Sequence, residues 1–97
     1  MFKKLNPILH SELRLALVSL LMANKECEFN FLLEKTKSSK GNLSVQLKKL
    51  KEVKYIEVEK SFRNNYPLTT CVITKKGKAA FEEYVEGLKS FINIKMN

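Results

Sequence analysis

The hydrophobic residues of the chain recur with the period of a helix in four segments and with the period of a strand in one. The first helical segment, residues 11–23, is so rich in Leu and Ala that apolar side chains cover more than one of its faces. Ser11 is well placed to be its N-cap, and Glu12 adds an acidic side chain to its first turn. A helix that is apolar on several sides needs cover on more than one side. In so small a chain, we expect part of that cover to come from a second subunit.

Two further helices are expected at residues 30–36 and 40–53, separated by a polar turn. Asn30 is a good N-cap for the first of them and Ser39 for the second. Within residues 40–53, leucines at spacings of four and three define one buried stripe. This stripe consists of Leu43, Leu47 and Leu50. The opposite face of the same helix is largely polar, so it is available for binding.

Residues 55–74 alternate between apolar and polar positions on both sides of a break, as the two strands of a hairpin do. The break, at residues 63–67, is rich in turn-forming residues. A short strand is also expected at residues 27–29. Thr74 can cap a last helix at residues 75–93, whose apolar residues recur at helical spacing. The expected fold class is therefore α+β and mainly helical, in a single domain that spans residues 1–97.

The charge of the chain is concentrated in one continuous segment. The 97 residues include 18 Lys and Arg and 10 Asp and Glu, which gives a formal net charge of +8. Residues 35–78 hold 12 of these cations and 3 of the anions, a net charge of +9, so the rest of the chain has a net charge of −1. A basic excess confined to one segment is typical of a surface that binds a polyanion.

Several other classes of protein are disfavoured. No apolar run is long enough for a transmembrane helix and the amino terminus does not resemble a secretory signal, so we expect a cytoplasmic protein. Neither a nucleophile motif, a phosphate-binding glycine loop nor a metal-ligand cluster is visible, so we expect no enzymatic activity, no metal and no other cofactor. Cys27 and Cys71 are interpreted as buried free thiols, with a redox switch as the alternative. His10 is expected to support the start of the first helix.

The predicted order of elements, with two helices joined by a short turn and followed at once by a hairpin, is that of a winged helix-turn-helix. Three stretches carry a closer resemblance: LNPILHSELRLALVSLL, KGNLSVQLKKLKEVKYIEVEK and TTCVITKKGKAAF. Through them, almost the entire chain resembles the stand-alone winged-helix regulators related to the MarR and ArsR groups. The most specific pieces are Gly-Asn-Leu-Ser at the start of the third helix and Thr-Lys-Lys-Gly before the last helix. One departure is Lys54, where relatives usually have Gly.

This resemblance implies a transcriptional regulator that binds double-stranded DNA, usually as a homodimer. It places the third helix in the major groove and the hairpin, called the wing, near the minor groove or the backbone. It also implies a three-helix core and a long C-terminal dimerisation helix.

The side chains of the basic segment are compatible with that role. Polar side chains on the third helix can read base edges, while lysines and hydroxyl groups can bind phosphates. Base readout is expected from Asn42, Val45 and Gln46, with Val45 limited to apolar contact. Ser44 lies on the same exposed face and is also expected to contact DNA. Backbone contacts are expected from Ser38, Ser39, Lys40, Lys48 and Lys49. On the wing, the residues expected to reach the adjacent groove are Lys60, Arg63, Asn64 and Asn65.

Plainer interpretations stay open for these residues. Exposed lysines are often only a solvated face, and asparagines often only form turns or support helix starts. The confinement of the lysines to one segment favours the polyanion, and with it DNA, over a winged-helix module for protein–protein interaction. A nonspecific, chromatin-type DNA-binding protein is a further alternative.

The apolar first and last helices are expected to hold a homodimer together. The predicted interface residues are Leu17, Leu21, Tyr84, Leu88, Phe91 and Ile92. Such a dimer presents two recognition helices to a pseudo-palindromic site, and repression by occupying a promoter is the simplest action. A small-molecule effector could bind between the dimer helix and the DNA-binding part, but the sequence identifies none.

Overall fold

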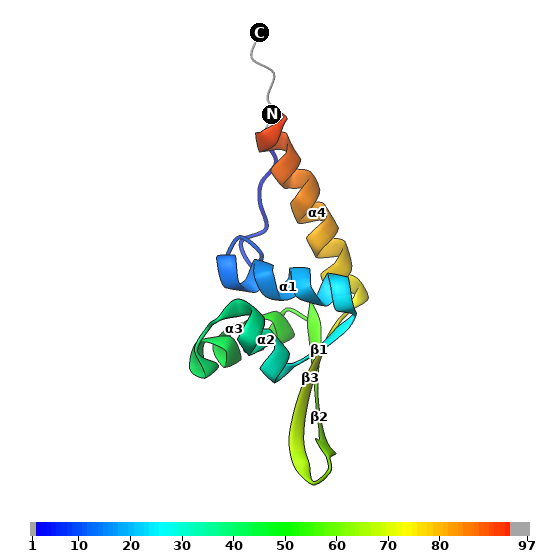
Figure 1. The fold of residues 1–97 in the computed structure, drawn as a ribbon. Helices are drawn as coiled ribbons and strands as arrows, with labels where there is room; N and C mark the ends of the chain where they lie inside the picture. The colour runs from blue at the N-terminus through cyan, green and yellow to red at the C-terminus, as the bar shows by residue number, and fades with distance from the viewer. Residues whose placement is uncertain (1, 94–97) are drawn as a thin grey trace.

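The computed structural model describes residues 2–93, in which four helices and three strands follow one another along the chain (Figure 1). Their bounds are α1 Glu12–Asn24, β1 Glu26–Glu28, α2 Phe29–Thr36, α3 Lys40–Glu52, β2 Ile56–Arg63, β3 Tyr66–Ile73 and α4 Lys75–Ile92. This order confirms the predicted fold class, an α+β and mainly helical winged helix-turn-helix with a long C-terminal helix. Within the described residues, no helix combines the length and the apolar character needed to cross a membrane.

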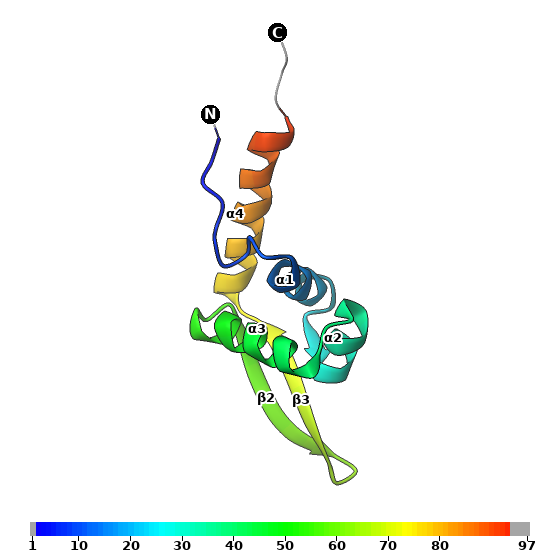
Figure 2. The same ribbon diagram turned by 90° about the vertical axis from the view of Figure 1, so that its left-hand side faces the viewer.

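The molecule is elongated, with extents of 62 × 25 × 21 Å, because the wing and α4 project from the helical body in different directions. In Figure 1, α1, α2 and α3 form the body, the β2–β3 hairpin extends below it and α4 rises above it. Figure 2 shows α3 lying across the body next to the base of the wing. The two predicted DNA-binding elements therefore lie together, at the end of the molecule opposite the tip of α4.

The hydrophobic core lies where the three body helices meet the base of the sheet. The leucine stripe predicted in α3 is confirmed, because Leu43, Leu47 and Leu50 are all buried. They pack with leucines from the other two body helices: Leu17, Leu21 and Leu32. Full burial of a leucine side chain stabilises a fold by about 1.5–3 kcal/mol, so these contacts fix how α3 sits against α1 and α2.

Three of the predicted helix caps differ in how they are built. The Ser39 hydroxyl accepts a hydrogen bond from the backbone N–H of Asn42 at 3.1 Å, as expected for the N-cap of α3. Ser11 occupies the N-cap position of α1, but its side chain makes no capping hydrogen bond. The expectation that Asn30 caps α2 is wrong, because α2 begins one residue earlier and its N-cap is Glu28. The short strand β1 runs directly into α2, which leaves no room for a separate cap.

The sheet has the order β1-β3-β2, and both pairs of neighbouring strands are antiparallel. Arg63 pairs with Tyr66 at the end of the wing, so Asn64 and Asn65 form a two-residue turn. Both asparagines have positive φ angles, 50° and 67°. A tight hairpin turn of this length favours positive φ at both positions, and Asn tolerates that conformation better than most residues. The turn-forming role of these asparagines is thus explained by the backbone alone.

The turn between α3 and β2 has a backbone conformation at Lys54 that favours glycine. The φ angle of Lys54 is 63°, in the left-handed region that favours glycine. The Thr74 hydroxyl donates to the Lys54 carbonyl oxygen at 2.7 Å and accepts from the Gly77 amide at 3.0 Å. Thr74 therefore caps α4, as predicted, and also holds the turn in place.

The two cysteines are free and buried, in agreement with the prediction of buried thiols. Cys27 on β1 lies directly opposite Cys71 on β3. Burial, and secondly the neighbouring Cys27, raise the pKa of the Cys71 thiol to about 11. Burial, and secondly Glu26, also raise the pKa of Cys27. Both groups are therefore protonated and poorly nucleophilic near neutral pH.

Candidate nucleic-acid interface

The outer face of α3 carries most of the residues expected to bind DNA. Because the leucine stripe faces the core, the side chains on the other side of the helix point to solvent. The exposed residues of this face are Lys40, Asn42, Ser44, Val45, Lys48 and Lys49. Val45 keeps 51% of its surface exposed, which is unusual for a β-branched apolar residue on a helix. The face thus combines cations, an amide, a hydroxyl and one apolar group, the combination that reads both phosphates and bases.

The serines before α3 are already engaged within the protein. Ser39 accepts from Asn42 as the N-cap, and the Ser38 hydroxyl lies 2.9 Å from the hydroxyl of Thr36. Ser39 is exposed and Ser38 is half-buried. Any phosphate contact from these two residues would therefore share a hydroxyl that also stabilises the turn before α3.

A shallow groove of about 370 Å³ joins α3 to the wing. Its walls include three lysines: Lys48, Lys51 and Lys60. Lys60 is on β2, so the groove brings together cations that are up to 12 positions apart in the sequence. Lys51 was not among the residues expected to contact DNA. The helical spacing of Ser44, Lys48 and Lys51 is the signal that could have placed it on the same side of α3.

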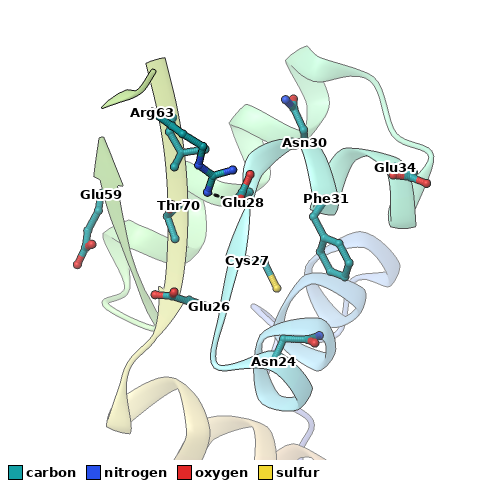
Figure 3. A pocket seen from close by; sticks show the side chains of 11 residues that line it. Asn24, Glu26, Cys27, Glu28, Asn30, Phe31, Glu34, Glu59, Arg63 and Thr70 are labelled. Carbon is teal, nitrogen blue, oxygen red and sulfur yellow. Dashed lines mark hydrogen bonds and ion pairs between the residues drawn. The ribbon is translucent and has the colours of Figure 1, made fainter. Parts of the chain in front are cut away.

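The other face of the sheet is acidic. In the strand register, Glu26 and Glu57 both lie opposite Val72, and Glu28 and Glu59 both lie opposite Thr70. Opposed residues of antiparallel strands share one face, so these four carboxylates lie together. A groove of about 650 Å³ on this side is lined by Glu26, Glu28 and Glu59, and also by Glu34 (Figure 3). The sheet therefore separates a basic side, next to α3, from an acidic side that repels a polyanion.

Arg63 belongs to the acidic side. Its guanidinium donates to the Glu28 carboxylate at 2.9 Å, as Figure 3 shows. Both side chains are largely exposed, and such surface ion pairs contribute only about 0.2–1 kcal/mol. The structure thus places Arg63 away from Lys60, although both were expected to reach the same groove of DNA.

Phe62 is exposed, which the sequence did not predict. The alternation along residues 55–63 put it on the same side as Ile56 and Val58, the inward side of a half-buried strand. The wing extends beyond the body at this point, so nothing covers that side and 76% of Phe62 is exposed. It lies opposite Pro67 in the register and on the same side as Lys60. An apolar ring therefore stands on the basic side of the wing tip.

Gln46 is turned toward α1 and is only half-exposed. Its Oε1 accepts a hydrogen bond from Nη1 of Arg14, and its Nε2 donates to Oδ1 of Asn42 at 3.0 Å. Two of the residues expected to read bases are therefore linked to each other and to α1.

These features, a helix-turn-helix whose second helix is basic and a wing beside it, lead to the comparison with known proteins. Residues 13–92 match the family of winged helix DNA-binding domains. The chain belongs to this family. The family and the fold are those of DNA-binding proteins and not those of an enzyme.

Relatives of this winged-helix chain include uncharacterized protein MJ0432 of Methanocaldococcus jannaschii, which is 40% identical over 78 residues, 80% of this chain and 85% of the relative. Among solved structures, a transcriptional regulator homologue from Pyrococcus horikoshii OT3 has a TM-score of 0.83 at 22% identity, with 89% of this chain and 85% of that chain covered. The regulator BldR of Sulfolobus solfataricus has a TM-score of 0.72 at 16% identity, covering 86% and 58%. A mutant of MarR from E. coli has a TM-score of 0.71 at 12% identity, covering 84% and 59%. The resemblance to MarR-type proteins is thus confirmed for the fold.

The residues expected at a subunit interface fall into two groups in the winged-helix structure. Leu17 and Leu21 are 0% exposed and Tyr84 is also buried, so the expectation that they contact a partner is wrong. The reason is that α1 is covered on several sides by elements of its own chain. Tyr84 further uses its hydroxyl for a hydrogen bond of 2.9 Å with Nδ1 of His10, just before α1.

The other three interface candidates lie near the end of α4. Leu88 is half-buried, and Phe91 stacks on Phe2 with 4.8 Å between ring centroids. Ile92 keeps 71% of its surface exposed. Within residues 2–93, Phe2, Phe91 and Ile92 are thus exposed apolar side chains that this end of the molecule offers to a partner.

Proposed function

We propose that this protein is a transcriptional regulator that binds a specific double-stranded DNA site as a homodimer and acts there as a repressor. The observation that carries the proposal is the two-sided distribution of charge. Lys48, Lys51 and Lys60 converge beside the outer face of α3, whereas the carboxylates gather on the other side of the sheet. The basic side therefore attracts a duplex more strongly than the acidic side does, and on the basic side α3 offers Asn42 and Val45.

The homodimer is proposed to form through the ends of α4. The exposed apolar residues there lie far from α3 and the wing, so pairing through them leaves both DNA-binding surfaces free (Figure 1). Two recognition helices related by twofold symmetry favour a pseudo-palindromic site with half-sites about one helical turn apart. Occupation of such a site in a promoter would block transcription. A DNA-binding regulator of this kind acts in the cytoplasm of a cell without a nucleus, and we place it there.

A module for protein–protein interaction is the second candidate, and the acidic side of the sheet is the surface that would serve it. The basic side argues against it as the main role, because a protein-binding winged helix has no need of cations along α3 and the wing. Nonspecific DNA binding would need the same cations, but it would not need Asn42 and Val45 to be exposed for contact with bases. Their exposure therefore favours a regulator that binds a specific site.

The decisive experiment is selection of bound duplexes from a random pool, followed by sedimentation of the complex. We expect a symmetric motif and two protein chains per duplex. Retention of DNA without enrichment of any motif would favour the nonspecific alternative. If the protein fails to retain DNA at low salt, a module for protein–protein interaction is the candidate function that remains.

A further inference from the structure

A chain of hydrogen bonds leads from α1 to the outer face of α3. Arg14 on α1 donates through Nε to the carbonyl oxygen of Ile8 at 2.6 Å and through Nη1 to Oε1 of Gln46. Gln46 in turn donates through Nε2 to Oδ1 of Asn42 at 3.0 Å. Arg14 and Gln46 are half-buried, whereas Asn42 is exposed. This series of hydrogen bonds therefore begins in the body and ends on the surface that is proposed to face DNA.

The chemistry of Arg14 fixes the direction of every bond in this chain. A guanidinium group has five N–H donors and no acceptor, so the group of Gln46 that faces it must be the carbonyl oxygen. The NH₂ group of Gln46 then points the other way, along α3 toward Asn42. Only an oxygen can accept from it, so Oδ1 of Asn42 faces Gln46 and Nδ2 faces away. Among residues 2–93, no protein group accepts a hydrogen bond from that Nδ2.

We propose that Arg14 is a positioning residue that sets the base preference of α3. By fixing the orientation of Gln46, it holds Asn42 with its two N–H donors toward the major groove. The matching base edges are those with acceptors, and guanine, with O6 and N7 side by side, offers two. An unconstrained Asn can instead turn its amide to pair with adenine, which needs both the oxygen and the NH₂ group. This inference rests on the proposed function, since it concerns which duplex the regulator selects.

The bond to Ile8 does not explain the position of Arg14 by itself. One donor is enough to satisfy the Ile8 carbonyl, and Arg14 uses Nε for it. The Nη1 bond is separate and reaches across to a different helix. A lysine at this position has a single charged group and cannot donate in the two fixed directions that the planar guanidinium offers.

The sharpest test is Gln46→Glu, which is nearly isosteric and keeps an acceptor for Arg14. A carboxylate accepts only, so its second oxygen would face Asn42 and force the Asn42 amide to turn, with Nδ2 inward and Oδ1 toward the groove. We expect wild-type protein to prefer an acceptor edge at the base pair facing Asn42 by about tenfold, and Gln46→Glu to prefer a donor edge, from adenine or cytosine, by a similar factor. Arg14→Met should reduce the preference to within about twofold.

The measurement is binding to duplexes of the selected site in which single base pairs are permuted. The base pair that faces Asn42 is identified as the position at which Asn42→Ala abolishes the preference for one base over the others. Lys49→Met is the matched control for Arg14→Met, because it also removes one positive charge, here from the exposed face of α3 and outside the hydrogen-bond chain, and should lower affinity for all duplexes by the same factor. If Arg14→Met also lowers all affinities equally, Arg14 is an electrostatic contact and the inference is overturned.

A second readout does not depend on DNA. In the free protein, the side-chain amide resonances of Gln46 and Asn42 should both shift in Arg14→Met, whereas Lys49→Met should leave them in place. Unchanged resonances would overturn the hydrogen-bond chain whatever the protein binds. The resonances can confirm the hydrogen bonds from Arg14 to Gln46 and Asn42 while no duplex is bound. In that case the proposed function fails, and the assigned base preference fails with it. Circular dichroism of each variant checks folding, and Gln46→Glu keeps the test available if Arg14→Met does not fold.

Discussion

The hydroxyl of Thr74 lies 2.7 Å from the carbonyl oxygen of Lys54 and joins the turn after α3 to the start of α4. At the same junction, the Tyr55 carbonyl oxygen accepts from the Thr74 amide at 3.0 Å and lies against Gly77. The Thr-Lys-Lys-Gly sequence is therefore a packing motif: threonine holds the turn, and glycine lets the helix approach it. The position of α3 relative to α4 depends on this contact.

Gly77→Ala should destabilise the protein by about 1–3 kcal/mol, because the added Cβ would lie 2.2 Å from the Tyr55 carbonyl oxygen. Backbone must move to relieve that contact. The matched control is Gly41→Ala in α3, where no atom lies within 4 Å of the added Cβ. Since alanine favours helix over glycine, this control should stabilise the protein by about 0.5–1 kcal/mol. Denaturant unfolding of both variants checks the prediction, and equal effects would contradict it.

Lys54→Gly should stabilise the protein by about 0.5 kcal/mol. Glycine removes the strain of a left-handed backbone conformation, and this gain exceeds the additional conformational entropy that glycine loses on folding. The φ angle of 63° supplies the reason. Lys51→Gly, in the last turn of α3, removes the same charge from a helical position and should instead destabilise by about 1 kcal/mol. Thermal unfolding distinguishes the two. A loss of stability in Lys54→Gly as large as in Lys51→Gly would show that its backbone is not strained.

Replacing Lys48 and Lys49 together by Ala should weaken binding to every duplex and make its salt dependence shallower, by about two in the slope of log K against log salt. Both side chains are exposed on the outer face of α3. Lys3→Ala with Lys4→Ala is a control of equal charge in the segment before α1, and it should leave the slope nearly unchanged. An unaltered slope in the α3 variant would remove these two lysines from the phosphate contacts.

The free energy of unfolding should fall as the pH rises from about 9 to about 11, owing to Cys71. Its folded pKa is raised above the ordinary thiol value of 9.0, so the folded state keeps the proton that the unfolded state loses in this window. The stabilisation is fully present below pH 9 and is lost as the pH passes the folded pKa. Cys71→Ala should be less stable at all pH values but should lack this component. Parallel pH dependences in the two proteins would contradict the assignment.

Phe91→Glu combined with Ile92→Glu should release monomers at micromolar concentration, because both substitutions place charge on the exposed apolar end of α4. Sedimentation velocity measures the result. Phe62→Glu is the control, since it replaces an exposed ring on the wing by a charged side chain and should leave the dimer intact. A dimer that survives the double substitution must use a different surface.

Local features of the fold were predictable from the sequence. The leucine stripe of α3, the Ser39 and Thr74 caps and the wing turn each depend on residues a few positions apart. Periodicity and capping act over that range, so they can be recognised without knowing the rest of the structure. The start of α2 was misplaced, because the backbone of β1 continues directly into it.

The sequence by itself determined the elements, their order and the segment that carries the positive charge, because these follow from local composition and spacing. The tertiary structure alone decided which faces meet. It buried Leu17 and Leu21 inside the protomer, placed Arg63 beside Glu28 on the acidic side, and linked Gln46 to Arg14. Each of these contacts joins residues on different elements, and its geometry depends on how the helices pack and on strand register. That packing is why the molecule has a basic side next to α3 and an acidic side across the sheet.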